Sequence, residues 1–181
     1  MDYSTMLVNR RSCRRFKNEE IDPSAVSAIL RAALMSPTSR NNRSWQFVVV
    51  DDKTDLQKLS DAKESGAAFL AQAALAIVVT GNPTTNDCWV EDGSIAAFAM
   101  QMQAEELSLG SCWVQIRGRY LSDGTKAEDV VRGILDIPEE QSILCILAIG
   151  KKQDCPPPHD EENLKWENVH IDKWMSRQVD E

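Results

Sequence analysis

The most informative stretch of the sequence is the run Arg10-Arg11-Ser12-Cys13-Arg14-Arg15-Phe16, close to the N-terminus. It gathers four arginines around a serine, although the chain has only 20 lysines and arginines against 28 aspartates and glutamates. Arginine binds phosphate oxygens through two parallel hydrogen bonds. A dense cationic run in an acidic chain therefore favours a pocket for one anionic ligand. Taken alone, the run fits a solvated basic turn after a helix equally well.

A second polar stretch follows downstream, with the sequence Ser36-Pro37-Thr38-Ser39-Arg40-Asn41-Asn42-Arg43-Ser44-Trp45-Gln46-Phe47. Its hydroxyl and amide groups lie just before an apolar segment that has the character of a strand. Proline, serine and asparagine are ordinary loop residues, so this stretch alone predicts a turn.

Hydrophobic periodicity predicts both helices and strands around these two stretches. The clearest helix begins at Asp22-Pro23, where aspartate can cap and proline suits the first turn, and it stops at Ser36-Pro37. Further helices are expected over residues 3–10, 54–62, 92–107 and 128–135. Strands are expected over residues 47–50, 76–79, 112–116 and 142–149. The unbroken apolar run of the first strand predicts burial on both faces.

The chain changes character after Gly150. The segment Lys151-Lys152-Gln153-Asp154-Cys155-Pro156-Pro157-Pro158 is not expected to form a helix or to pair within a sheet. Disordered segments carry few aromatic residues. Because Trp166 and Trp174 reappear in this polar tail, we expect an extended arm that docks on another surface.

Composition excludes several classes of function. The length fits one domain, and the net charge of −8 argues against nucleic acid as a partner. The sequence holds no long uncharged apolar run and no signal-peptide pattern, so we expect no membrane span and a cytoplasmic location. The five cysteines are scattered without a Cys-x-x-Cys pair, which predicts free thiols. A zinc site is not expected, because no cluster has ligand spacing.

The two polar stretches resemble motifs of the nitroreductase family of FMN-dependent oxidoreductases. Residues 10–16 match a pattern like Arg-Arg-Ser-x-Arg-x-Phe, and residues 36–47 match one like Ser-Pro-Ser-Ser-x-Asn-x-Gln-Pro-Trp-x-Phe. Residues 92–113 resemble the central helix of that family and its Gly-Ser-x-Trp turn, and residues 147–150 with the proline-rich tail resemble its last strand and arm. The resemblance covers nearly the whole chain in the same order.

This resemblance implies an α+β fold with a central, mostly antiparallel sheet flanked by helices. Residues 1–181 would form a single domain, of which residues 151–181 are an extended C-terminal arm. It also implies a homodimer in which the central helix lies at the interface, each arm wraps the partner, and the binding sites lie between the subunits.

The resemblance also assigns roles to single residues. Arg10 and Ser12 would bind the phosphate and ribityl end of FMN, and Arg11 would lie along the same path. Arg14 would lie near the N1–C2=O edge of the flavin and tune its electronics. The loop that reaches the flavin from the partner subunit would contribute Pro37, Thr38, Ser39 and Asn41. The backbone strip facing the flavin ring would be Cys112, Trp113, Val114 and Gln115.

The chain departs from the family pattern at three places. Arg43-Ser44 replaces the usual Gln-Pro, and Gln115-Ile116 replaces the glycine after the Gly-Ser-x-Trp turn. The tail lacks the arginine that many members use on the phosphate. Lys151 and Lys152 are the available substitutes, with His159 a weaker candidate.

The implied function is that of an FMN-dependent oxidoreductase with NAD(P)H as electron donor. It would work by ping-pong hydride transfer to nitroaromatic, quinone or related small acceptors, without a catalytic acid or base. A flavin reductase or a dehalogenase-type enzyme on the same scaffold is the alternative within enzymes, since fold does not fix the acceptor. A flavin-binding electron-carrier module, or an α+β protein that binds no flavin, is the alternative outside them.

Overall fold

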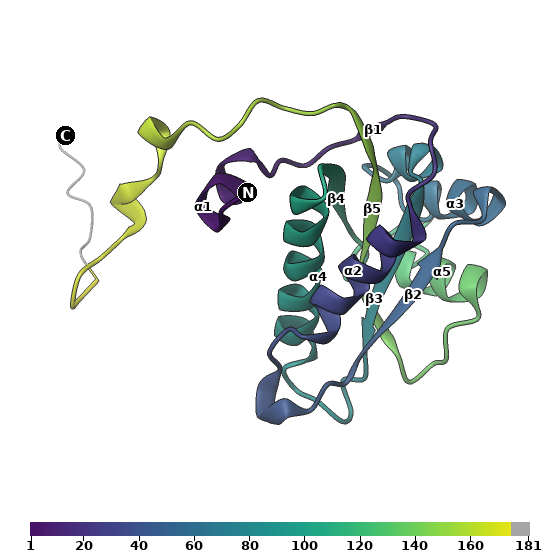
Figure 1. Ribbon diagram of the computed structural model, residues 1–181. Coiled ribbons are helices and arrows are strands. Elements are labelled where there is room, and N and C mark those ends of the chain that lie inside the picture. The colour runs from purple at the N-terminus through teal and green to yellow at the C-terminus, as the bar shows by residue number, and fades with distance from the viewer. Residues whose placement is uncertain (175–181) are drawn as a thin grey trace, which may run out of the picture.

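The protein is built around a five-stranded antiparallel sheet, seen in a computed structural model that describes residues 1–174 (Figure 1). The strands are β1 (Arg15–Phe16), β2 (Trp45–Val50), β3 (Leu75–Gly81), β4 (Leu109–Gln115) and β5 (Ser142–Asp154). The long strand β5 is the centre of the sheet, because β3, β4 and β1 all pair with it. Strand β2 pairs with β3.

Helices cover both faces of this sheet. They are α1 (Tyr3–Asn9), α2 (Pro23–Leu34), α3 (Lys53–Ser60), α4 (Trp89–Glu106) and α5 (Ala127–Leu135). Shorter 3₁₀ helices span Ser39–Asn41, Ala68–Gln72, Glu161–Asn163 and Trp166–Asn168. Side chains of β3 alternate between two hydrophobic clusters: Ile77 packs with α2 and α4, and Val78 packs with α3 and α5. The α+β class expected from the sequence is confirmed.

Local chemistry explains the boundaries of α2. The Asp22 carboxylate accepts a hydrogen bond from the Ser24 backbone N–H at 2.8 Å, and Pro23 occupies the first turn. Proline suits that position, because the N–H groups of a first helical turn have no partner within the helix. The predicted start of this helix is confirmed.

Strand β2 differs from the prediction of burial on both faces, which is wrong. Its Val49 side chain is 40% exposed, and only Trp45 and Val50 are buried. The reason is its position at the edge of the sheet, which a continuous apolar run does not reveal.

Strand β5 also continues further than expected. Residues 151–154 were expected to stay out of the sheet, but Lys151 pairs with Leu109 of β4, and Lys152 and Asp154 pair with β1. The first proline of the tail stands only at position 156, so the backbone N–H groups before it can still donate to neighbouring strands.

Beyond β5 the chain forms an arm that leaves the helical layers (Figure 1, yellow-green to yellow). Trp166 is 70% exposed and Trp174 is 81% exposed, so the described arm buries neither side chain in its own subunit. Residues 175–181 of the expected arm lie outside the described residues. None of the helices described here is both long and apolar enough to cross a bilayer.

Candidate functional site

The arginine-rich segment lies beside the first half of β4. The Cys13 backbone N–H donates to the Ser111 carbonyl oxygen at 3.0 Å, and Ser12 forms an isolated parallel bridge with Ser111. Successive side chains of an extended segment point to opposite faces. Residues 10, 12 and 14 therefore share one face, and residues 11, 13 and 15 share the other.

The first face gathers cations around the thiol of Cys112. Burial raises the pKa of this thiol, whereas the charge of Arg14, a hydrogen bond with the Ser12 side chain, and the charges of Arg10 and Lys63 lower it. These groups thus lie within electrostatic reach of one sulfur atom. The structure brings together Arg10, Ser12, Arg14 and Cys112, four of the residues that the family resemblance assigns to the cofactor.

Lys63 is a member of this cluster that the sequence analysis missed. It follows α3 in a polar loop, where no sequence signal distinguishes it from other surface lysines. Burial and the charge of Arg119 lower its pKa, and the effect of Cys112 opposes them. Its ammonium group therefore lies in a partly desolvated, electropositive environment.

The cations on this face stand outside the ion pairs of the described chain. Within residues 1–174, no ion pair involves Arg10, Arg14 or Lys63. The Arg14 guanidinium lies over the Phe69 ring, 5.9 Å from its centroid. An anionic ligand is the natural counterpart for positive groups that are held together outside such ion pairs.

The opposite face of the same segment binds the start of the arm. The Arg11 guanidinium donates to the Pro157 and Pro158 carbonyl oxygens, and Cys13 is joined to Cys155 by a disulfide. Arg11 was expected along the cofactor path, but the structure places it on the arm side. The prediction of free thiols is wrong for these two cysteines. The spacing of cysteines in the sequence does not show that the end of β5 places residue 155 beside residue 13.

The two lysines proposed as phosphate ligands are both paired with carboxylates. They are consecutive in β5, and successive side chains of a strand point to opposite faces. Lys151 Nζ lies 2.6 Å from a carboxylate oxygen of Glu19. Lys152 Nζ lies 2.8 Å from both carboxylate oxygens of the buried Glu105. The His159 backbone N–H donates to the Val8 carbonyl oxygen at 2.8 Å.

The strip from Cys112 to Gln115 forms the second half of β4. Its only strand partner among the described residues is β5, so the other edge of β4 is open beyond the bridge to Ser12. The Trp113 indole N–H donates to the Gln115 side chain at 2.9 Å, and Gln115 in turn donates to the Arg117 carbonyl at 2.8 Å. The open edge offers backbone groups to a planar ligand beside the cationic cluster.

The polar loop of residues 36–44 is fixed to the start of α4. The Asp92 carboxylate accepts hydrogen bonds from the Ser39 backbone N–H and the Asn86 side chain, both at 2.8 Å. Inside the loop, the Thr38 hydroxyl accepts from the Arg43 N–H at 3.1 Å, and the Asn41 side chain accepts from Arg43 Nε at 2.8 Å. The anchoring role of Asp92 was not visible in the sequence, because it depends on a residue 53 positions away.

This loop and the arginine cluster lie at opposite ends of α4 (Figure 1). Asp92 lies in the first turn of this 18-residue helix and Glu105 in its last, and such a helix is about 27 Å long. One chain therefore does not bring Pro37, Thr38, Ser39 and Asn41 to Arg10, Ser12 and Arg14.

An apolar groove of about 390 Å³ lies along the outer side of α4, between α1 and the end of α2. Its lining includes Tyr3, Met35, Pro37, Phe98 and Met102. Several of these side chains are large, apolar and exposed, with Met35 at 71%. Apolar surface of this kind on an otherwise charged protein marks an interaction site.

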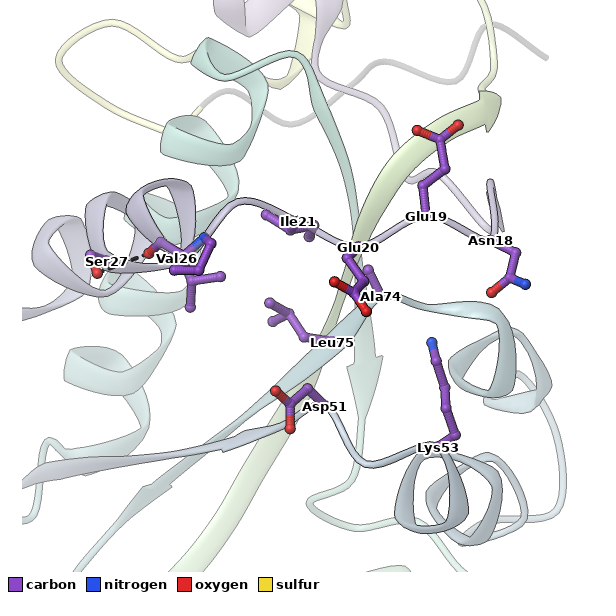
Figure 2. Close-up of a pocket in the computed structure, with 11 residues that line it drawn as sticks. Asn18, Glu19, Glu20, Ile21, Val26, Ser27, Asp51, Lys53, Ala74 and Leu75 are labelled. Carbon is purple, nitrogen blue, oxygen red and sulfur yellow. Dashed lines mark hydrogen bonds between the residues drawn. The ribbon is translucent and has the colours of Figure 1, made fainter.

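A larger cavity of about 850 Å³ lies elsewhere, where the segment before α2 passes the ends of β2 and β3 (Figure 2). Its lining includes Glu19, Glu20, Asp51 and Lys53, and Figure 2 shows that the Glu19 carboxylate points away from the other three side chains. No residue of the arginine segment or of β4 lines this cavity. Its acidic lining makes it a poor site for a phosphate.

Known proteins resemble this chain along nearly its full length. The sequence model of the nitroreductase family matches residues 7–80 and 54–151. A putative NADH dehydrogenase/NAD(P)H nitroreductase of Archaeoglobus fulgidus is 30% identical over 174 residues, which are 93% of this chain and 97% of the relative.

Solved structures show the same fold. An FMN-dependent nitroreductase from Clostridium difficile R20291 superposes with a TM-score of 0.91 at 40% identity, over 93% of this chain and 98% of its own. A putative NADH dehydrogenase/NAD(P)H nitroreductase from Bacteroides thetaiotaomicron superposes with a TM-score of 0.85 at 26% identity, over 94% and 97% of the two chains.

Proposed function

Because the chain belongs to the nitroreductase family and is an oxidoreductase, we propose that it binds FMN and uses NADH or NADPH to reduce a nitroaromatic, quinone or related small acceptor in two half-reactions. One observation carries the proposal. Arg10, Ser12, Arg14 and Lys63 converge beside the open edge of β4, and the three cations have no acidic partner among residues 1–174.

The residues present fit FMN. A dianionic phosphate requires guanidinium and hydroxyl donors, which Arg10 and Ser12 supply on one face of the segment. Arg14 and Lys63 would stabilise negative charge on the flavin ring and so favour its reduced form. Burial raises the pKa of the Cys112 thiol, so this side chain stays neutral near pH 7 and adds no opposing charge. When bound, FMN supplies the hydride chemistry that side chains cannot perform.

We also propose that the working form is a homodimer with sites between its subunits. The partner would supply Pro37, Thr38, Ser39 and Asn41, since these lie at the far end of α4 from the arginine cluster of their own chain. The groove along α4 offers the apolar surface for the contact. In this proposal residues 1–181 form one domain, and the part of the arm beyond residue 154 docks its exposed tryptophans on the partner.

The first test is a visible absorption spectrum of the purified protein before and after anaerobic NADH. We expect a flavin band that NADH bleaches and a subsequent acceptor restores. A flavin band that NADH leaves unchanged would instead support the electron-carrier alternative. Protein that stays colourless after incubation with FMN would contradict the proposal altogether.

The second test is the variant Arg10→Ala, with Arg15→Ala as its matched control on the opposite face. Hydrogen bonds to charged groups contribute about 1.5–3 kcal/mol, so the loss of Arg10 should weaken FMN binding roughly 10- to 100-fold. Arg15 pairs with Asp154 at 3.6 Å, both side chains being 65% exposed, and its loss should change FMN affinity less than about twofold. Equal effects of the two variants on the FMN dissociation constant would refute the assignment of faces.

A further inference from the structure

We propose that Cys13 and Cys155 are a thiol–disulfide modification site that controls how firmly the start of the arm is held against the cofactor segment. This inference rests on the proposed function, because it concerns the regulation of the same FMN site. The disulfide joins the residue between Ser12 and Arg14 to the first residue after β5, with a Cα–Cα distance of 4.8 Å. That distance lies within the usual range for a disulfide.

Cys13 packs closely against the backbone of β4 at Gly110. A Cβ atom placed on Gly110 would lie 2.9 Å from Cys13 Cβ and 3.2 Å from its sulfur, so only glycine fits at that position of β4. Cys13 itself is buried, whereas Cys155 is half-buried. A small thiol from solution therefore reaches the Cys155 sulfur first.

The exchange reaction follows from this exposure. The thiolate of a low-molecular-weight thiol attacks Cys155 Sγ, the bond between the two protein sulfurs breaks, and Cys13 leaves as a thiolate that takes a proton. A second thiol molecule attacks the resulting mixed disulfide and releases Cys155 as a thiol. The protein disulfide gains two electrons and two protons, and the two reagent thiols become one disulfide. A low-molecular-weight disulfide runs the same steps in reverse.

The segment is also held to the end of β5 by strand pairing, in which Arg15 lies opposite Asp154 and Phe16 opposite Lys152, but side-chain and backbone contacts to residues beyond β5 are fewer. Arg15 and Asp154 form an exposed ion pair, the Arg11 guanidinium donates to two proline carbonyls, and the His159 N–H donates to the Val8 carbonyl. Exposed pairs of this kind contribute little to stability. The disulfide is thus the covalent constraint on the arm where it leaves β5, and its reduction allows the residues after Asp154 to separate from the segment while the pairing of β1 with β5 remains.

Closure of the disulfide should increase FMN affinity. The side chains of Arg10, Ser12 and Arg14 alternate with the disulfide along one backbone, so fixing residue 13 from the arm side limits the freedom of its neighbours. Pre-organisation of this kind strengthens binding, and couplings between sites are commonly 5- to 150-fold. We expect FMN to bind about tenfold more tightly to the oxidised form. By reciprocity, saturating FMN should make the disulfide about tenfold harder to reduce.

The experiment uses the full chain equilibrated with mixtures of oxidised and reduced dithiothreitol. Alkylation followed by peptide mass analysis gives the fraction of Cys13 and Cys155 that is disulfide-bonded, with and without FMN, and flavin fluorescence gives the FMN dissociation constant. We expect Cys155→Ser to bind FMN like the reduced wild type and to be insensitive to the redox buffer. Cys88→Ser, which removes a free thiol, should behave as wild type.

Amide hydrogen exchange provides a readout that does not depend on FMN. The Cys13 and His159 amides, which donate to Ser111 and Val8, should exchange faster in the reduced protein than in the oxidised one. Free thiols at both positions in the fully oxidised buffer would overturn the inference, as would equal exchange rates in the two forms. If neither form binds FMN but exchange still differs, the proposed function fails while the control of the arm stands. If both forms bind FMN with equal affinity, the coupling to the cofactor is refuted.

Discussion

Among the ion pairs of residues 1–174, the pair Lys152–Glu105 should be the costliest to break. Lys152 Nζ contacts both Glu105 oxygens at 2.8 Å, and the two side chains are 30% and 7% exposed. Lys152→Met keeps the length of the side chain but removes its charge, which leaves the Glu105 carboxylate buried without its counter-ion. Removing one partner of a buried pair costs about 3–5 kcal/mol of unfolding free energy.

That loss is large against the total stability of a domain, which is about 5–15 kcal/mol. With a urea dependence of about 2 kcal/mol per M, the unfolding midpoint should fall by about 2 M at fixed protein concentration. Urea unfolding followed by circular dichroism, without reductant, measures this shift. Lys151→Met is the matched control, because Lys151 and Glu19 are 46% and 47% exposed and their pair should contribute no more than about 1 kcal/mol.

The double variant Lys152→Met with Glu105→Leu isolates the cause. Replacing both charges with apolar groups removes the uncompensated carboxylate, so most of the lost stability should return. The reasoning fails if Lys152→Met lies within about 1 kcal/mol of wild type, or if the double variant is no more stable than the single one. The stable double variant also separates the structural role from the earlier hypothesis of phosphate binding: we expect it to keep its FMN affinity.

Two further predictions concern the same end of the sheet. Gly150→Ala would place a Cβ atom 2.8 Å from a ring carbon of Phe16, so overpacking should cost about 1–3 kcal/mol in urea unfolding; Gly133→Ala, with nothing within 4 Å, is the control and should be neutral or stabilising. Ending the chain after His159 removes the exposed tryptophans but keeps the disulfide, and should shift the mass seen in size-exclusion chromatography with light scattering from dimer to monomer. An unchanged mass would exclude the arm as a major dimer contact.

Elements whose signals are local were predictable from the sequence. The Asp22-Pro23 start of α2 depends on neighbouring residues alone, and the strand expected over residues 76–79 lies within β3, all of whose residues are buried. The similar apolar run of β2 gave a wrong prediction of burial on both faces, because an edge strand and a central strand can have the same side chains. What differs between them is the number of neighbouring strands, and that is a property of the folded chain.

At the candidate site, too, features set by neighbouring residues could be predicted from the sequence, and features set by tertiary contacts could not. The composition of residues 10–16 indicated an anion site, but not which side chains face it. That the Arg11 side chain points to the arm can be inferred only when the segment is known to be extended and to lie beside β4. Lys63 and Asp92 reach their partners across loops and strands, so no spacing in the sequence could indicate their roles.

The alternation along residues 10–15 has a consequence for assembly. One face of this short segment carries the groups proposed for FMN, and the other holds the first residues of the arm through Arg11, Cys13 and Arg15. If the partner supplies the loop of residues 37–41, as proposed, that loop and the segment of residues 10–15 bind the same FMN from two subunits. Binding of FMN and association of the subunits must then favour each other by equal factors, because coupling between two binding equilibria is reciprocal. A cofactor site divided in this way would be completed by dimerisation itself.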